Sequence, residues 1–202
     1  MLWYQAKYPV TSLRKVFSVI KPIMRMPVFL SLPAAPATED DLQIGRDLLD
    51  TLAAHAHECV GMAANMIGQA KRIIVFDHDG RRRLMFNPEI VAKQQPFETQ
   101  EGCLSLEGVR ATTRYKRIEV RFQDESFTWH TEKFSGWTAQ IIQHEIDHCN
   151  GILIYRARPA GLGGGEAGAR FRGRRFQRFV LACRFPEKAF QEFAANLTRA
   201  LQ

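Results

Sequence analysis

The chain has 202 residues and a mass of 23.1 kDa, and 46% of its residues are hydrophobic and 24% charged, which excludes a wholly disordered protein. The formal net charge of +7 is unevenly distributed, because residues 39–155 carry 13 Lys and Arg against 18 Asp and Glu. Residues 156–184 carry eight Arg and a single acid, Glu166. The basic character therefore belongs to the ends of the chain, around an acidic body, and does not by itself predict nucleic-acid binding.

The sequence predicts neither a membrane span nor a secretory signal. The most apolar stretch, residues 16–32, is interrupted by Lys21, Pro22, Arg25 and Pro27, which excludes a transmembrane helix. The first twenty residues lack the charged start and apolar run of a secretory signal. The four cysteines follow no disulfide framework, so we expect free thiols in a cytoplasmic protein.

The first regular element is predicted after an irregular, proline-containing N-terminal segment. Thr38 followed by three acidic residues is typical of a helix start, since an N-cap hydroxyl and acids in the first turn both satisfy free backbone N–H groups. Leucines and alanines at helical spacing then predict a helix over residues 39–57. Residues 59–68 are rich in small side chains and are expected to form a loop.

Short strands are predicted next. Apolar and β-branched runs indicate strands at residues 72–76, 84–86, 90–93, 118–122 and 127–131. His78-Asp79-Gly80 is expected to form the turn that follows the first of them.

A second helix is predicted over residues 137–149. The Asn150-Gly151 pair ends it, since glycine readily adopts the left-handed conformation that closes a helix. Residues 152–155 are predicted as a last short strand.

These elements predict one α+β domain over residues 21–155, preceded by an N-terminal arm at residues 1–20. The composition then changes abruptly. Residues 156–184 are rich in glycine and arginine and are expected to be a flexible basic linker. Residues 185–202 recover apolar residues at helical spacing, which predicts an amphipathic C-terminal helix.

The second predicted helix carries the motif H-E-x-x-H at residues 144–148. Residues four apart lie on the same face of a helix, so His144 and His148 can bind one metal ion. Glu145 lies beside His144, where a general base acting on a water molecule is needed. A surface helix with two solvated histidines would carry the same motif, so a third ligand decides between the two interpretations.

Cys103 is the candidate for that third ligand. A cysteine thiolate binds divalent iron, zinc, nickel or cobalt, and the preceding Gly102 allows the backbone to approach the site closely. Two histidines and one cysteine leave a coordination position open for water, as in catalytic metal sites. The alternative is a buried core cysteine without a metal.

Three segments in this order resemble the signature motifs of the peptide deformylase family. They are VGMAANMIG at residues 60–68, EGCLS at residues 101–105 and QHEIDHCNG at residues 143–151. The resemblance covers residues 21–155 and implies an α+β fold in which antiparallel strands surround the H-E-x-x-H helix. It implies a hydrolase that removes the formyl group from N-formylmethionine on nascent proteins. It also implies Fe²⁺ as the metal, with Zn²⁺, Ni²⁺ or Co²⁺ able to replace it.

The same resemblance assigns roles to individual residues. Cys103, His144 and His148 would bind the metal. Glu145 would take a proton from the attacking water and later give one to the leaving amine. Leu104 would donate its backbone N–H to the oxyanion.

Four further residues are expected to contact the formylated peptide, two of them glycines that offer main-chain groups. These substrate-binding residues are Val60, Gly61, Gly102 and Arg110.

Cys59 and Met66 depart from the family pattern G-x-G-x-A-A-x-Q, where they replace a glycine and the glutamine. In typical deformylases that glutamine amide donates a hydrogen bond to the formyl oxygen, whereas a thioether has no proton to donate. Losing one oxyanion donor lowers kcat by about 10²–10³-fold. Asn65 and Gln143 are the nearby amides that could substitute for it. The sequence therefore predicts a deformylase with reduced or altered activity.

Two other functions stay open from the sequence. One is a catalytically silent relative that binds metal or peptide and contacts the ribosome, because arginines interleaved with Phe171, Phe176 and Phe179 are typical of RNA-binding tails. The same basic segment could instead dock on the acidic body. The other function is a zinc peptidase, which would normally take its third ligand downstream of the helix and not upstream, as at Cys103.

Overall fold

In a computed structural model of the protein, residues 19–155 and 180–181 are described. The helical segments are α1 (Pro27–Leu30), η1 (Glu39–Asp41), α2 (Leu42–Ala54), η2 (Ala64–Ile67) and α3 (Gly136–Cys149), of which η1 and η2 are 3₁₀ turns. The strands are β1 (Gly61–Ala63), β2 (Ile73–His78), β3 (Arg81–Cys103), β4 (Leu106–Gln123), β5 (Trp129–Ser135) and β6 (Val180–Leu181). The predicted C-terminal helix and nearly all of the predicted arm and linker lie outside the described residues.

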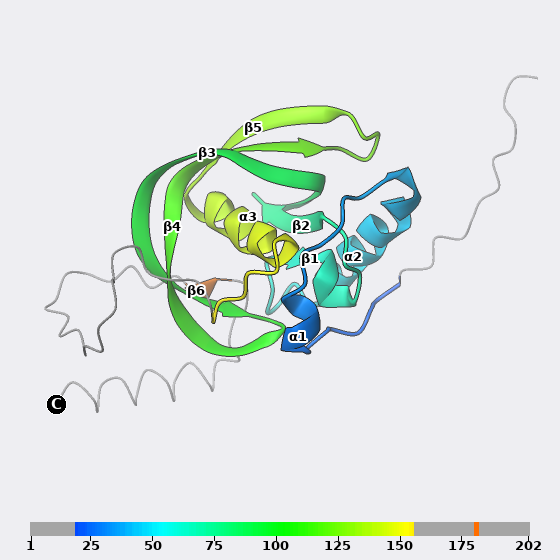
Figure 1. Cartoon of the computed structure of the whole chain (residues 1–202), viewed down its shortest axis with the longest axis horizontal. Helices are drawn as coiled ribbons and strands as arrows, with labels where there is room; N and C mark the ends of the chain where they lie inside the picture. The colour runs from blue at the N-terminus through cyan, green and yellow to red at the C-terminus, as the bar shows by residue number, and fades with distance from the viewer. Residues whose placement is uncertain (1–18, 156–179, 182–202) are drawn as a thin grey trace, which may run out of the picture.

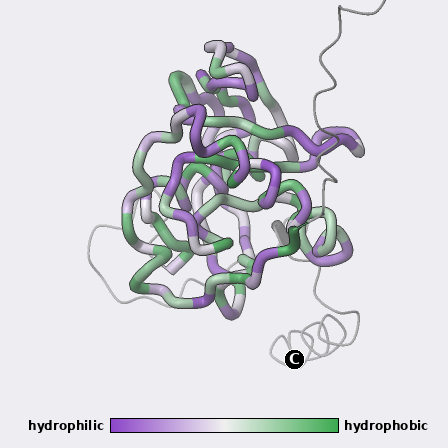
Figure 2. The backbone as a smooth tube through the Cα atoms, turned by 90° about the vertical axis from the view of Figure 1, so that its right-hand side faces the viewer, coloured by the Kyte–Doolittle hydropathy of each residue, from purple (hydrophilic) through white to green (hydrophobic). Residues whose placement is uncertain are grey.

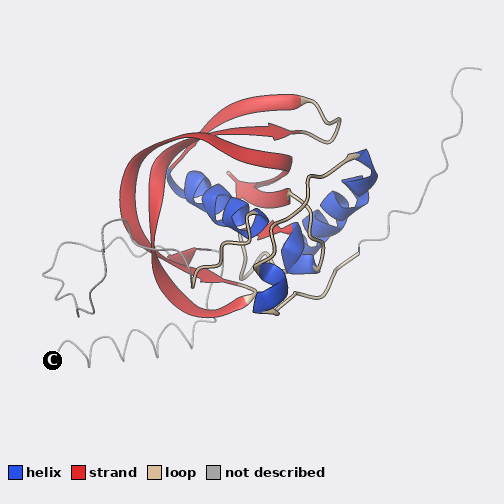
Figure 3. Ribbon diagram, viewed as in Figure 1, coloured by secondary structure: helices blue, strands red, loops and turns tan. Residues whose placement is uncertain are grey.

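One sheet carries the fold. Its strands follow the order β1-β2-β3-β4-β5 with every neighbouring pair antiparallel, and β6 pairs in parallel with β3. The long strands β3 and β4 curve around α3, which lies in the concave face of the sheet (Figures 1 and 3). This arrangement confirms the predicted α+β fold with antiparallel strands around the H-E-x-x-H helix.

Strand β2 is buried on both faces, because α3 packs on one side and α2 on the other. Ile74 and Phe76 belong to the apolar cluster that includes Ile141 and Ile142 of α3. Ile73 and Val75, which alternate with them, belong to a second cluster that includes Leu48 and Leu52 of α2. The period of two along a strand thus divides the core into two layers. Figure 2 shows hydrophobic and hydrophilic stretches interspersed along the backbone.

The start of the first predicted helix is confirmed, with a tighter first turn. The Asp41 carboxylate accepts hydrogen bonds from the Thr38 backbone N–H at 2.8 Å and from the Thr38 hydroxyl at 3.2 Å. The first turn is the 3₁₀ segment η1, and the α-helix proper ends at Ala54, before the predicted residue 57. Among the described residues, no helix is long and apolar enough to cross a membrane.

The sequence predicted one loop wrongly, and strands are confirmed at three predicted places, but with too short a predicted extent. Residues 59–68 are not all loop, because β1 pairs with β2 there and η2 follows. The predicted strands at 84–86 and 90–93 are parts of the single strand β3, and 118–122 is the end of the longer β4. The strand residues that the sequence did not predict form backbone pairs between β3 and β4, while many of their side chains are exposed. They therefore carry no apolar run that would indicate a strand.

The predicted strand at residues 152–155 is also wrong, because its first backbone group closes α3. The N–H of Ile152 donates to the Asp147 carbonyl at 2.8 Å and the N–H of Gly151 to the His148 carbonyl at 3.2 Å. Gly151 adopts a left-handed φ of 68° between them. This double hydrogen bond is the usual closing motif of a helix that ends in glycine, and it confirms the predicted end of α3.

The Gly151 closure is testable by substitution. A Cβ at residue 151 would clash with the backbone carbonyl oxygen of Ser31, so Gly151→Ala combines backbone strain with a backbone clash. We expect a loss of about 2–5 kcal/mol in the free energy of unfolding, measured by urea denaturation. Gly80→Ala is the matched control, since φ is 77° there and no heavy atom lies within 4 Å. It should cost about 1–2 kcal/mol, and equal losses for the two variants would contradict the clash.

Candidate metal centre

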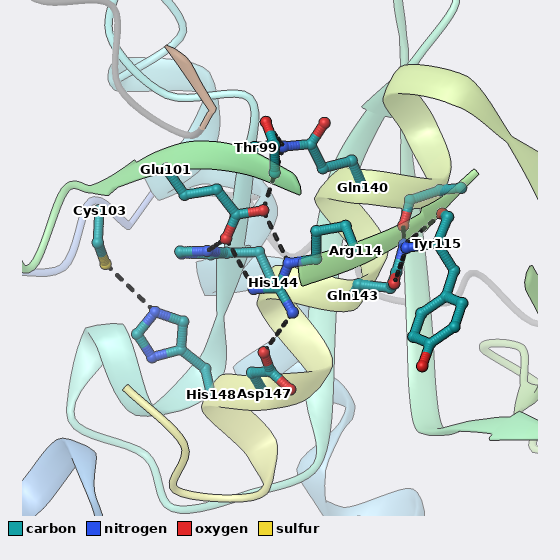
Figure 4. Close-up of polar contacts among 11 residues, drawn as sticks. Thr99, Glu101, Cys103, Arg114, Tyr115, Gln140, Gln143, His144, Asp147 and His148 are labelled. Atoms are coloured by element: carbon teal, nitrogen blue, oxygen red, sulfur yellow. Dashed lines mark hydrogen bonds and ion pairs between the residues drawn. The ribbon is translucent and has the colours of Figure 1, made fainter. Parts of the chain in front are cut away.

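Strand β3 and helix α3 bring the three predicted metal ligands together. The ligand atoms of Cys103, His144 and His148 all lie within 4.8 Å of one another, and the Cys103 Sγ is 3.2 Å from the His148 Nε2 (Figure 4). All three side chains are buried. Bonds of about 2.0–2.3 Å from one cation to nitrogen and sulfur span the 3.2 Å between Cys103 and His148. The His144 Nε2 has no hydrogen-bond partner among the described residues, so its lone pair is free for a metal ion.

Glu101 determines which nitrogen of His144 is available. Its carboxylate lies 3.0 Å from the His144 Nδ1, which places the imidazole proton on that nitrogen and leaves Nε2 as the ligand atom. Glu101 is two residues before Cys103 on β3, and its side chain is completely buried. A carboxylate in this position orients the imidazole ring and strengthens its basicity toward a metal.

Arg114 on β4 neutralises the buried Glu101 carboxylate. Its Nε and Nη2 donate to the two carboxylate oxygens at 2.8 and 2.7 Å, and its Nη1 donates to Asp147 on α3. Gln140 adds a hydrogen bond to Glu101 at 3.2 Å. Burial by itself would raise the pKa of Glu101, but the hydrogen bonds from Arg114 and His144 lower it to about 2. Glu101 is therefore a permanent anion that links β3, β4 and α3.

The surroundings of Cys103 favour its thiolate form. Burial alone would raise the pKa of this thiol, but the neighbouring His148 and His144 overcome that effect and lower it to about 5. By contrast, burial raises the pKa of Cys149 to about 12, and that of the Cys59 thiol is also raised. Because the thiolate is the metal-binding form of cysteine, Cys103 stands out from the other described cysteines as a ligand.

Glu145 lies beside the ligand set with a different environment from Glu101. Neither of its carboxylate oxygens has a hydrogen-bond partner among the described residues, and the side chain is completely buried. Burial raises its pKa to about 7. A carboxyl group with a pKa near neutrality can both accept and donate a proton under physiological conditions.

The backbone of β1 passes close to Glu145 at Gly61. A Cβ at this position would lie 2.7 Å from the Glu145 Oε1 and 2.5 Å from the Ile141 Cγ2, so only glycine allows this approach. Gly102, Cys103 and Leu104 line a pocket of about 250 Å³ that also includes Arg25 and lies beside the ligand set.

Val60 and Arg110 lie outside the buried cluster. Val60 lines a separate hollow of about 510 Å³ that includes His78 and Trp137. Arg110 is exposed, and its guanidinium lies 5.1 Å from the centre of the Tyr155 ring. The guanidinium that reaches the site is that of Arg114.

In the sequence, Glu101 stood out only as part of a motif. The sequence did not predict that Arg114 and Gln140 bind its carboxylate, or that Asp147 binds Arg114. Residues two apart on a strand share a face, so the spacing of Glu101 and Cys103 could have signalled that the carboxylate turns toward the metal. The approach of Arg114 depends on the register between β3 and β4, and the sequence carries no comparable signal for it.

The two amides that could have replaced the missing glutamine are already used elsewhere. Asn65 donates from Nδ2 to the carbonyls of Leu30 at 3.3 Å and His148 at 2.9 Å, which ties η2 to the end of α3. The Gln143 side-chain oxygen accepts a hydrogen bond from the Tyr115 N–H, and its Nε2 donates to the carbonyls of Tyr115 and Ala139. Met66 is completely buried, and its sulfur accepts a contact from the Ala63 N–H at 3.4 Å. Neither Asn65 nor Gln143 is therefore free to donate an amide proton to a substrate oxygen.

A buried Cys-His-His set with a buried carboxyl group next to one of its histidines on α3 is the arrangement of a metallohydrolase. A model of the polypeptide deformylase family matches residues 15–160. The peptide deformylase of Clostridium beijerinckii is 49% identical over 136 residues, which cover 67% of this chain and 100% of the relative. The chain belongs to the polypeptide deformylase family.

Solved structures agree with this assignment. A peptide deformylase from Thermotoga maritima matches with a TM-score of 0.63 and 31% identity, over 69% of this chain and 99% of that one. A Met-Ala-Ser-bound class I type b peptide deformylase from Acinetobacter baumannii matches with a TM-score of 0.64 and 27% identity, over 70% of this chain and 100% of that one.

The buried ion pair is testable by removing its cation. Arg114→Met leaves Glu101 charged and buried without its partner, so we expect a loss of about 3–5 kcal/mol in the free energy of unfolding. The matched control is Arg83→Met, which breaks a two-bond pair with Glu132 whose side chains are 29% and 40% exposed. That control should cost at most about 1 kcal/mol in urea denaturation. Similar losses for the two variants would show that Arg114 is not essential to the buried charge.

Proposed function

We propose that this chain is a metal-dependent deformylase that hydrolyses the amide bond between the formyl group and the N-terminal methionine of nascent peptides. The observation that carries the proposal is the position of Glu145, which is buried on α3 next to His144, while Cys103 of β3 and His148 of α3 complete the candidate ligand set. The products of this hydrolysis would be formate and a peptide with a free amino terminus. The relatives named above are themselves peptide deformylases, which favours an enzyme over a catalytically silent binding protein.

The donor set fits a divalent transition metal held by Cys103, His144 and His148. Thiolate and imidazole ligands suit Fe²⁺, Zn²⁺, Ni²⁺ and Co²⁺, and the family resemblance favours Fe²⁺ as the resident ion. When bound, the metal would polarise the formyl carbonyl and lower the pKa of water. A zinc peptidase is less well supported, because the third ligand lies upstream on β3.

Glu145 would act first as the general base and then as the general acid of the reaction. In its ionised form it takes a proton from the water that attacks the formyl carbon. It then gives that proton to the departing amine nitrogen as the carbon–nitrogen bond breaks. The pKa of about 7 suits both roles, since neither protonation state is strongly favoured at neutral pH.

The main chain of β1 and β3 would hold the peptide. The Val60 carbonyl accepts a hydrogen bond from the Asp77 N–H on β2 at 2.8 Å. Because successive residues of a strand point their main-chain groups to opposite edges, Gly61 directs its groups away from β2, where a peptide strand can pair. Gly102 would provide main-chain contacts on the other side and Leu104 its N–H to the oxyanion, with Val60 and Arg110 near the peptide side chains.

A ribosome contact through residues 156–184 stays a prediction, as does a cytoplasmic location. Basic residues that neutralise phosphates would make such a contact weaken with added salt.

Glu145→Gln tests the proton carrier. The amide keeps the size of the side chain but cannot accept the proton, so we expect kcat to fall by about 10²–10⁴-fold. Hydrolysis of formyl-Met-Ala-Ser by nickel-loaded protein measures the loss, and metal analysis should show unchanged nickel content. Glu98→Gln is the matched control on exposed β3 surface and should keep full activity. Undiminished hydrolysis by Glu145→Gln would remove this residue from the mechanism.

Met66→Gln tests the missing oxyanion donor. The new amide should raise kcat by up to about 10²–10³-fold if the buried thioether is what limits stabilisation of the oxyanion. Met66→Leu, which adds no donor, is the control and should leave kcat close to that of the natural protein. If the natural protein is inert and Met66→Gln is equally inert, the oxyanion explanation is wrong.

A further inference from the structure

The short strand β6 occupies the outer edge of β3 beside the metal centre. Val180 and Leu181 pair in parallel with Gln100 and Glu101, whereas β4 pairs with the opposite edge of the same two residues. Figure 1 shows β6 next to the long curved strands, and Figure 4 shows it beside the part of β3 that carries Glu101. A distant part of the chain thus returns to the strand that leads to Cys103.

This position is close to the groups that carry the chemistry. Cys103 follows Glu101 by two residues, which is about 7 Å along an extended strand. The intervening Gly102 lines the pocket of about 250 Å³ together with Cys103 and Leu104. Strand β6 therefore pairs with β3 directly before the residues of β3 that line this pocket.

A peptide and β6 would need the same edge. An extended peptide that joins a sheet uses the free N–H and C=O groups of one strand edge, and each edge accepts only one partner. Because β4 takes one edge of β3 at Gln100 and Glu101, a peptide that reaches Gly102 from this side meets β6 on the other. Two paired residues provide few hydrogen bonds, so a peptide could displace them.

We propose that β6 (Val180–Leu181) is a tethered competitor of the substrate peptide, which lowers the apparent affinity for substrate until it is displaced. The proposal rests on the proposed function. Residues 156–179 connect this segment to the end of the described core at Tyr155, so the competitor is always present at high local concentration.

Charge complementarity supports the contact. The segment from 156 to 184 carries eight Arg and a single acid, and it flanks β6 on both sides. Residues 39–155, which form the sheet and its helices, carry 18 acids against 13 bases. Opposite charges would favour the pairing of β6 with β3 at low ionic strength and would do so less as salt screens them.

The test compares the full chain with its double variant Val180→Pro and Leu181→Pro. Proline has no backbone N–H and disfavours pairing within a sheet, so the variant should free the β3 edge. For formyl-Met-Ala-Ser we expect KM to fall by roughly 3- to 30-fold, as expected when a tethered competitor is removed, with kcat unchanged. The matched control is Ala167→Pro with Gly168→Pro, which adds two prolines to the same basic segment and should keep the original KM.

Two further measurements test the competition independently of the KM comparison. The difference in KM between the full chain and the variant should shrink as salt increases, and backbone amides of residues 100–103 should exchange faster in the variant. Active proteins with equal KM values would overturn the competition, and so would unchanged amide exchange. If neither protein hydrolyses the substrate, the proposed function fails, and binding of the product Met-Ala-Ser then decides. Tighter binding by the proline variant would support the competition, and equal binding would overturn it.

Discussion

The Glu101 carboxylate is the interaction on which the rest of the site depends. It is completely buried, so it would be strongly destabilising without compensation, and it receives a two-bond ion pair from Arg114 and a bond from His144. Glu101 lies on β3, Arg114 on β4 and His144 on α3, so one charge joins the curved sheet to the helix inside it. The same set of contacts therefore stabilises the fold and orients His144, a candidate metal ligand.

Two buried glutamates on neighbouring elements have opposite properties because their surroundings differ. Glu101 is surrounded by donors and has a pKa of about 2, whereas Glu145 has no partner among the described residues and a pKa of about 7. The first is an anion that orients His144, and the second is the proton carrier of the proposed mechanism. The packing of Gly61 against Glu145 maintains this difference, because a larger residue would push the carboxyl group away.

Met66 and β6 both modify a site whose ligand set is intact. The buried thioether removes an amide donor that neither Asn65 nor Gln143 replaces, since both amides bind backbone groups of the fold. The β6 pairing adds a partner to the strand edge beside Cys103. One change acts on the transition state and the other on access, so kcat and KM report on them separately.

The sequence by itself determined the family motifs, the helix α3 with its two histidines, and Cys103 as the candidate third ligand. These features are local or depend on fixed spacing, such as i and i+4 on one helical face. Only the tertiary structure decided that Arg114 and not Arg110 reaches Glu101, that Asn65 is already used, and that β3 continues through its exposed middle. Those outcomes depend on strand register and on the curvature of the sheet, which bring together groups whose separation along the chain carries no periodic signal.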